Sequence, residues 1–134
     1  MEFHIRCKPE DIARYVFTPG SHSRAKKIAA HFDDARLVSD SRGYLVYTGY
    51  VDGIRMTVSS TGMGGPTTAI CLEELAHMGA DTFIRVGSCG TFQDDITVGV
   101  SCRYAVVVAI KSNQRQGVDF AALNSPCFKP TAWD

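Results

Sequence analysis

The fold is decided by residues 54–90, which read IRMTVSSTGMGGPTTAICLEELAHMGADTFIRVGSCG. A strand, a glycine turn, a helix, a second strand and a second glycine turn follow one another in this stretch. Such a succession is typical of an α/β sheet that carries functional loops at the ends of its strands. Ile54, Met56 and Val58 alternate with polar residues, which predicts that the first strand buries one face and exposes the other.

The helix of this stretch is predicted to run from about Pro66 to Met78, with Gly79 ending it as a cap. Apolar residues on one face are Ala69, Leu72, Leu75 and Ala76, and the opposite face holds Glu73, Glu74 and His77. The apolar face is expected to pack on the sheet. Residues 82–87 are predicted to form the strand that leads into the second glycine turn.

The residues before this stretch continue the same pattern. Residues 15–20 are typical of a short buried strand that ends in a Pro-Gly turn. Ser21 stands where the N-cap of a helix is expected, and apolar residues follow at helical spacing: Ala25, Ile28, Ala29 and Phe32. Asp52-Gly53, between the apolar runs 45–51 and 54–59, predicts a β-hairpin.

Composition limits the class of protein. The chain has 134 residues, 45% hydrophobic and 21% charged, which suits one globular domain. Fourteen Lys and Arg balance fourteen Asp and Glu, so the basic excess typical of nucleic-acid or anionic-membrane binders is absent from the sequence. The apolar run 105–110 is too short to span a bilayer, and the charged N-terminus lacks a signal-peptide core. Five cysteines without a CxxC pair match no zinc motif, and we expect reduced thiols in a cytoplasmic protein.

Three glycine-bearing turns have features that bind anions. Residues 19–24, PGSHSR, combine Gly20 with a following helix N-terminus and Arg24; residues 62–66 open the second helix; and residues 85–88 hold an arginine and a serine. Backbone N–H groups at such turns bind anions, and arginine binds phosphate through two hydrogen bonds at once. Arg85 stands among apolar residues and is expected to be partly buried and to need a partner.

Other polar residues are weaker candidates when taken singly. Arg24 and Arg42, the latter beside Gly43, are each typical of solvated surface cations. The four histidines have no metal-binding spacing; His31 and His77 are expected on helix surfaces and His22 in a loop. The sequence contains no P-loop, dinucleotide fingerprint, nucleophile elbow or HExxH motif. The residues alone therefore predict an α/β domain that binds a small anion such as phosphate.

Two segments carry a resemblance to a known family: residues 60–75, STGMGGPTTAICLEEL, and residues 79–90, GADTFIRVGSCG. With the turns above, they resemble the N-terminal part of the nucleoside phosphorylases, the family that holds uridine phosphorylase and hexameric bacterial purine nucleoside phosphorylase. The similar stretch runs from about His4 to Gly99. The resemblance implies an α/β three-layer sandwich with a central mixed β-sheet.

The resemblance also implies roles for individual residues. Gly20, Arg24, Arg85 and Ser88 match phosphate-binding positions of the family, with Arg85 as the catalytic residue and Ser88 also near the ribose. Arg42 matches an arginine that a neighbouring subunit lends to the phosphate, and His4 matches a histidine that reaches the ribose from that neighbour. A homo-oligomer built from dimers, such as a hexamer, is expected.

The implied reaction is phosphorolysis of a nucleoside, in which phosphate is a co-substrate and no metal or organic cofactor is needed. Residues 80–85 favour the uridine branch, which yields uracil and ribose 1-phosphate, whereas Ser88-Cys-Gly90 leans toward the purine branch. A non-catalytic domain that binds phosphate or oligomerises is the alternative. A nucleosidase that uses water would not need Arg24, Arg42 and Arg85 together.

Two features depart from the family. Ser21 replaces the acidic residue of the family's Pro-Gly-Asp loop, and the Met-Glu pair that holds the ribose hydroxyls has no match apart from the initiating Met1-Glu2. We therefore expect a phosphorylase-like domain over residues 1–99 and a divergent or truncated tail over residues 100–134, with one strand near 104–110. Little or no turnover of nucleoside is expected from this chain.

Overall fold

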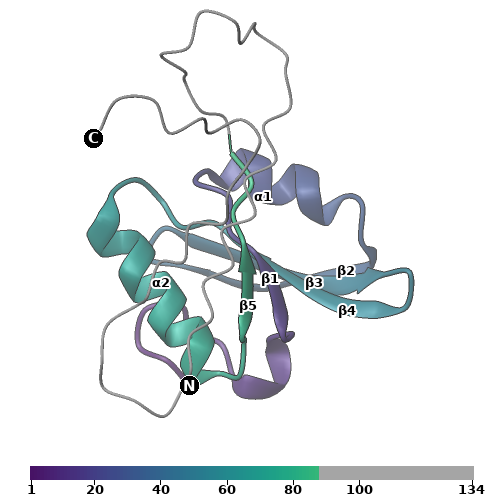
Figure 1. The fold of residues 1–134 in the computed structure, drawn as a ribbon, viewed down its shortest axis with the longest axis horizontal. Coiled ribbons are helices and arrows are strands. Elements are labelled where there is room, and N and C mark those ends of the chain that lie inside the picture. The colour runs from purple at the N-terminus through teal and green to yellow at the C-terminus, as the bar shows by residue number, and fades with distance from the viewer. Residues whose placement is uncertain (88–134) are drawn as a thin grey trace, which may run out of the picture.

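The computed structural model describes residues 1–87 of the chain. Two helices and a mixed five-stranded sheet make up this part (Figure 1). In chain order the elements are a 3-10 helix η1 (Pro9–Asp11), β1 (Tyr15–Phe17), α1 (His22–Ala29), β2 (Asp33–Ser41), β3 (Tyr44–Val51), β4 (Ile54–Ser59), α2 (Gly65–His77) and β5 (Thr82–Ile84). The predicted boundary at residue 99 and the predicted strand at 104–110 lie outside the described residues.

The sheet has the strand order β2-β3-β4-β1-β5. β2, β3 and β4 form antiparallel pairs, whereas β1 lies between β4 and β5 and runs parallel to both. Val16, in the middle of β1, lies opposite Thr57 of β4 and Phe83 of β5. The predicted mixed sheet is therefore confirmed, and the carboxyl ends of three neighbouring strands lie at one edge.

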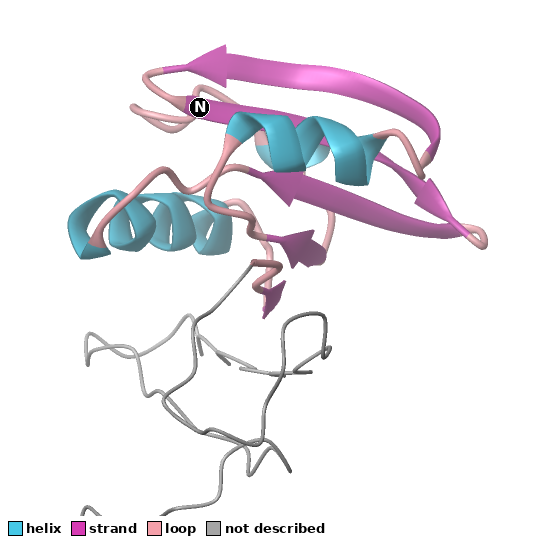
Figure 2. Ribbon diagram, turned by 90° about the horizontal axis from the view of Figure 1, so that it is seen from above, coloured by secondary structure: helices cyan, strands magenta, loops and turns pink. Residues whose placement is uncertain are grey.

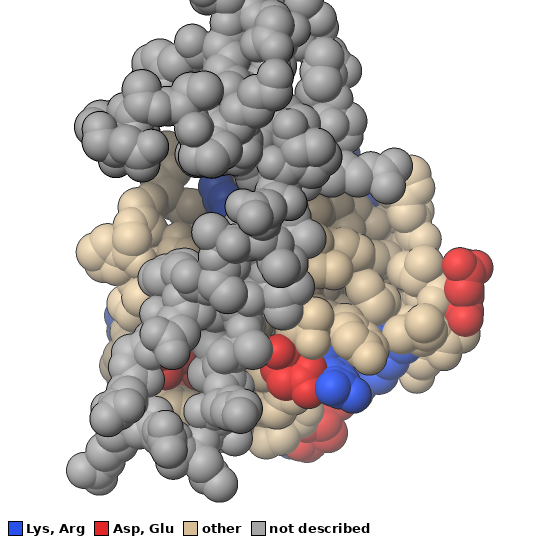
Figure 3. Space-filling view, in the orientation of Figure 1, with Lys and Arg blue, Asp and Glu red and all other residues tan. Residues whose placement is uncertain are grey.

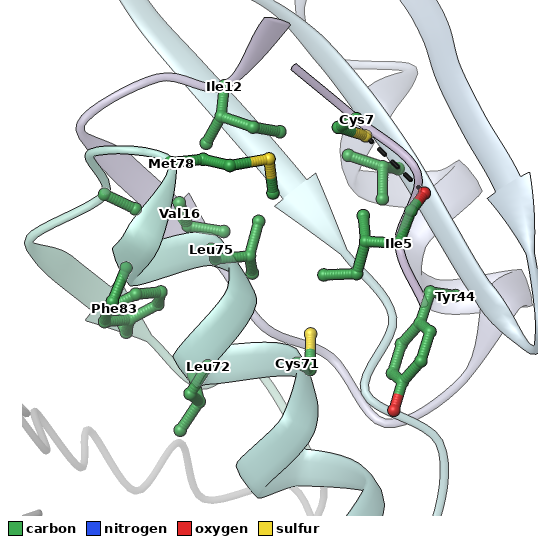
Figure 4. Packing of buried hydrophobic residues seen from close by; sticks show 13 residues of the cluster. Ile5, Cys7, Ile12, Val16, Tyr44, Cys71, Leu72, Leu75, Met78 and Phe83 are labelled. Atoms are coloured by element: carbon green, nitrogen blue, oxygen red, sulfur yellow. Dashed lines mark hydrogen bonds between the residues drawn. The ribbon is translucent and has the colours of Figure 1, made fainter. Parts of the chain in front are cut away.

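Both faces of the sheet are covered. Phe17 and Tyr47 pack with α1, whereas the residues before them in the strands, Val16 and Val46, pack with α2 and the N-terminal segment. Since successive side chains of a strand point to opposite faces, the two helices lie on opposite sides of the sheet. Figure 2 shows α1 lying across the hairpin strands, and Figure 4 shows α2 side chains meeting the second face. These three layers agree with the predicted sandwich.

Local signals placed the hairpin turn, the start of α1 and the end of α2 correctly, whereas α1 ends at Ala29, before the expected Phe32. Ser21 caps α1, where its Oγ accepts a hydrogen bond from the Arg24 N–H at 3.4 Å. Asp52 and Gly53 both have positive φ, 50° and 77°, as the tight hairpin turn requires. Beyond α2, Gly79 adopts a φ of 103° and donates its N–H to the Ala76 carbonyl at 3.0 Å, which closes the helix.

The prediction that β4 has one exposed face is wrong. Thr57 and Ser59 are fully buried, and Ile54 at the hairpin tip is 53% exposed. β4 lies inside the sheet with a covering layer on each side, so its polar side chains must find partners there. Thr57 Oγ1 accepts from the Ala13 N–H at 2.9 Å, and Ser59 Oγ lies 3.4 Å from Cys71 Sγ.

Two further differences concern strand limits. β2 was not among the expected strands, because its residues are largely polar and exposed at the edge of the sheet. Its first residues cross close to β3, where a Cβ on Gly49 would lie 2.7 Å from the Asp33 carbonyl oxygen. β5 ends at Ile84 rather than at residue 87.

Within residues 1–87, neither helix has the length and apolar character needed to cross a bilayer.

A candidate anion site at the carboxyl edge of the sheet

Three chain segments meet at the carboxyl edge of the parallel strands. β1 continues into residues 18–20, β4 into residues 60–62 and β5 into Arg85. Loops at this edge of an α/β sheet are the usual place for ligands. Each of the three segments was predicted to bind an anion, and the strand order explains why they come together.

Backbone hydrogen bonds fasten these segments to one another. The Thr18 N–H donates to the Ile84 carbonyl at 2.8 Å, which joins the end of β1 to the end of β5. The Thr61 N–H donates to the Pro19 carbonyl at 2.9 Å, which joins the residues after β4 to the same loop. Backbone hydrogen bonds therefore connect all three segments at this edge of the sheet.

The Arg85 guanidinium lies over Gly20. A Cβ built on Gly20 would be 3.7 Å from Arg85 Nη2, 4.0 Å from Nη1 and 3.6 Å from the Gly62 carbonyl oxygen. A larger side chain at position 20 would occupy the space between the guanidinium and the loop. Gly20, Gly62 and Arg85, which are far apart in the sequence, thus surround one small region.

The expected burial of Arg85 is wrong. Its side chain is exposed, because β5 ends at Ile84 and Arg85 is the first residue beyond it. No carboxylate within residues 1–87 forms an ion pair with it. An exposed guanidinium that forms no ion pair within these residues has its charge available for an anion.

The N-terminus of α1 borders the same loop. Arg24 is half-buried in its first turn, three residues after the capping Ser21. His22 is the first residue of the helix rather than a loop residue, and its ring Nε2 lies 2.7 Å from the Gly43 carbonyl oxygen. His31 is exposed but lies beyond the end of α1 rather than on the helix surface, whereas His77 is exposed at the end of α2, as expected. Ser88 lies outside the described residues.

His4 and Arg42 gather around one aromatic ring. The Arg42 guanidinium carbon lies 4.8 Å from the Phe3 ring centroid, a cation–π contact. The His4 and Phe3 ring centroids are 5.0 Å apart, with the rings nearly perpendicular. Phe3 itself is 65% exposed. The two residues for which a role in a neighbouring subunit is predicted therefore form one surface cluster, Phe3–His4–Arg42.

Glu74 holds the N-terminal segment in place, a role that the sequence pattern did not predict. It was assigned to the polar face of its helix, but it is 7% exposed. Its carboxylate accepts the N–H of Ile5 at 2.8 Å and that of His4 at 3.0 Å, and its Oε1 lies 2.5 Å from His4 Nδ1. A helical-wheel signal existed, because Glu74 falls between Cys71 and Met78 on the face that packs on the N-terminal segment.

The contacts of Glu74 change its acidity. Burial is the largest single influence and raises the pKa of the carboxyl group. The hydrogen bonds from Ile5 and His4, with the charge of His4, together outweigh burial and bring the pKa below its usual range. Glu74 is therefore ionised at neutral pH, and His4 Nδ1 is its hydrogen-bond donor.

The two described cysteines have no sign of reactive thiolate chemistry. Cys7 and Cys71 are buried, and burial raises the pKa of each thiol to about 11. Thiols with such a pKa remain protonated at neutral pH. Within the described part of the chain, no three His, Cys, Asp or Glu side chains are grouped as metal ligands.

Charges at the opposite edge of the sheet are paired. Arg14 Nε lies 2.6 Å from Asp81 Oδ2, at the amino ends of β1 and β5, and this hydrogen bond lowers the pKa of Asp81. Figure 3 shows acidic and basic side chains side by side at the lower edge of this face. Arg14 at the amino edge is thus paired with a carboxylate, in contrast to Arg85 at the carboxyl edge, which forms no ion pair within residues 1–87.

Comparison with known proteins identifies the family. The family model described as the phosphorylase superfamily matches residues 14–114. The chain belongs to the phosphorylase superfamily. The match passes Gly99, where the resemblance based on motifs ends, and includes all three segments of the candidate site that the structure describes.

Curated relatives of this phosphorylase-superfamily chain include enzymes of both branches. A uridine phosphorylase from Thermococcus kodakarensis is 46% identical over 125 residues, which cover 92% of this chain and 45% of the relative. A uridine phosphorylase from Treponema pallidum is 44% identical over 98% of the chain and 51% of its own length. A DeoD-type purine nucleoside phosphorylase from a Thermoanaerobacter species is 36% identical over 98% of the chain and 55% of its own length.

A solved structure confirms the predicted fold class. The uridine phosphorylase from Vibrio fischeri superposes with a TM-score of 0.68 at 37% identity, over 70% of this chain and 39% of that one. The chain spans about half the length of the curated relatives that it matches.

Proposed function

We propose that this chain supplies the phosphate-binding half of a nucleoside phosphorylase of the uridine type. The observation that carries the proposal is the Arg85 guanidinium over Gly20 at the carboxyl edge of three parallel strands. Relatives that are named uridine phosphorylase, at 46% and 44% identity, support the choice of the uridine branch. The site residues proposed are Gly20, Arg24, Arg42, Arg85 and Ser88 for phosphate and His4 and Ser88 for ribose.

The proposed reaction is the phosphorolysis of uridine. An oxygen of hydrogen phosphate forms a bond to ribose C1′ while the bond from C1′ to uracil N1 breaks, and the phosphate proton is transferred to uracil. The sugar becomes cationic in the transition state, so a dianion held against it lowers the barrier. The role of Arg85 and the backbone N–H groups near Gly20 is to hold and orient that dianion.

Two of the proposed site residues are proposed to act between subunits. Arg42 and His4 lie together around the exposed Phe3, on the surface of the molecule. A second copy that places this cluster beside its partner's Arg85 would complete the site. We therefore propose a dimer as the smallest complete unit.

The activity test uses a hybrid protein. The chain is joined to the remaining residues of the Thermococcus kodakarensis relative, and release of uracil from uridine is followed with and without phosphate. Phosphate-dependent release that is lost in the Arg85→Ala hybrid is the expected result. Release that does not depend on phosphate would contradict phosphorolysis, and a preference for inosine would assign the chain to the purine branch. The 134-residue chain alone is expected to bind phosphate and to release little uracil.

A further inference from the structure

One side chain ties the turn that carries Arg42 to residues 18–21, the loop between β1 and α1 that we call the anion loop. His22 Nε2 lies 2.7 Å from the carbonyl oxygen of Gly43, which also accepts from Ser60 Oγ at 3.4 Å. A carbonyl oxygen has no proton to give, so His22 must carry its proton on Nε2 in this contact. His22 is only two positions beyond Gly20, so the bond spans from the anion loop to the turn between β2 and β3.

The two residues of this turn are held in different ways: Arg42 contacts the Phe3 ring, and Gly43 accepts hydrogen bonds. Arg42 and Gly43 both have positive φ, 49° and 86°, and both are exposed. A Cβ on Gly43 would have no neighbour within 4 Å, so that side of the turn is open space. Between the paired strand residues Ser41 and Tyr44, the Gly43 side of the turn is therefore positioned by hydrogen bonds rather than by packing. The 2.7 Å bond from His22 is the shorter of the two that reach the Gly43 carbonyl.

We propose that His22 is a positioning residue, which fixes the Arg42–Gly43 turn against the anion loop and so sets where Arg42 presents its charge. The inference rests on the proposed function only where it concerns phosphate. Its structural part, the tether itself, stands on the contact geometry. His22 touches the turn and not the phosphate, so its removal is expected to change the placement of Arg42 without removing a cation.

The test compares His22→Ala and His22→Gln in the full 134-residue chain. The amide nitrogen of glutamine occupies nearly the same place as Nε2 and donates a hydrogen bond, so it should restore the tether. His31→Ala is the matched control, because His31 is an exposed histidine at the other end of α1. Two quantities are measured: the rate of tryptic cleavage after Arg42 and the dissociation constant of inorganic phosphate.

We expect His22→Ala to raise the cleavage rate and to weaken phosphate binding, each by about fivefold, the effect of losing one neutral hydrogen bond. His22→Gln should return both quantities close to those of the unsubstituted chain, and His31→Ala should leave both unchanged. Nitrogen NMR should find the His22 proton on Nε2.

Unchanged cleavage in His22→Ala, or a His22→Gln variant that behaves like His22→Ala, would overturn the tether. Faster cleavage with unchanged phosphate affinity would overturn the positioning role for Arg42. An unsubstituted chain that binds no phosphate would instead overturn the proposed function, and the cleavage rates would still decide whether the tether exists.

Discussion

Arg85 is exposed to solvent because it lies one residue beyond the end of β5 rather than inside the strand. Placed after β5, its guanidinium lies over Gly20 with solvent access. We expect Arg85→Ala to weaken phosphate binding by about 2–3 kcal/mol, because a charge-assisted double hydrogen bond is lost. Arg85→Lys should recover only part of the affinity, since an ammonium group cannot bind two oxygens in a fork. Calorimetry with phosphate measures both.

The control for Arg85 is Arg14→Ala. Arg14 is an exposed arginine at the opposite edge, already paired with Asp81. Its removal should leave phosphate affinity unchanged. Equal losses in the two variants would indicate a general effect of net charge, and a folded Arg85→Ala protein with full affinity would remove Arg85 from the site.

Glu74 gives a pH-dependent contribution to stability. Its pKa is lowered in the folded chain, whereas an unfolded glutamate has a pKa of about 4.3. The stabilisation by the carboxylate is therefore present above the unfolded value and is lost as the pH falls through the folded value. We expect Glu74→Gln to lower the free energy of unfolding by about 1 kcal/mol at neutral pH, and the difference from the unsubstituted chain to vanish in acid.

Urea unfolding at several pH values measures this difference. Glu73→Gln is the matched control, because Glu73 is the exposed neighbour of Glu74 on the same helix. It should be close to neutral at all pH values. A Glu74→Gln deficit that is the same in acid as at neutral pH would show that shape, not charge, holds His4 and Ile5.

Single residues also show what the sequence could predict of the site. Gly20 and Gly62 were correctly expected where the chain leaves β1 and β4, and the φ of 72° at Gly62 is a local property of the backbone. The burial of Arg85 was wrong, because it depends on whether β5 ends at residue 84 or 87. Glu74 was assigned to a solvated face, because the N-terminal segment that covers it is about 70 residues distant in sequence, with separations of 69 and 70.

At the scale of elements, the C-terminus of α2 depends on Gly79. Its φ of 103° is a conformation that other residues adopt only with strain. We expect Gly79→Ala to lower the free energy of unfolding by about 1 kcal/mol, as measured by urea titration. Gly65→Ala is the control at the other end of α2, where a Cβ meets nothing within 4 Å. A Gly79→Ala variant as stable as Gly65→Ala would contradict the strain argument.

Elements with a local signal were predicted well, and those defined by their neighbours were not. Three predicted features were confirmed: the Asp52-Gly53 hairpin turn, the Ser21 N-cap and the Gly79 helix end. Each depends on the conformation of a few adjacent residues. β2 was missed because it is an exposed edge strand with two register shifts against β3 and lacks an alternating apolar pattern. Burial of both faces of β4 follows from strand order, which composition does not reveal.

At the scale of the whole molecule, the proposed sharing of residues between subunits predicts complementation. Arg42→Ala and Arg85→Ala chains should each bind phosphate weakly. Mixed dimers of the two variants contain one site with both substitutions and one site with neither. Mixing the variants should therefore restore up to half of the phosphate-binding capacity of the mixed dimers. Calorimetry on the mixture, with sedimentation to measure oligomer size, is the test.

A mixture that binds no better than its components would contradict the sharing of Arg42. A stable monomer at micromolar concentration would do the same. Arg36→Ala provides the matched control for Arg42→Ala: its guanidinium is bonded to Asp11, and it should neither weaken phosphate binding nor complement Arg85→Ala.

The parallel neighbours of β1 have a consequence for the order of folding. Tyr15 pairs with Met56 on one side and Thr82 on the other. β1 therefore cannot pair with either neighbour until residues about 40 and 65 positions later have been synthesised. The region around Gly20 exists only once β5 has docked, because Arg85 follows that strand directly. A bound phosphate would stabilise the state in which β5 is docked against β1. At a hundred times its dissociation constant it would add about 2.7 kcal/mol to the free energy of unfolding. Phosphate would then shift the population toward chains in which the five-stranded sheet is complete.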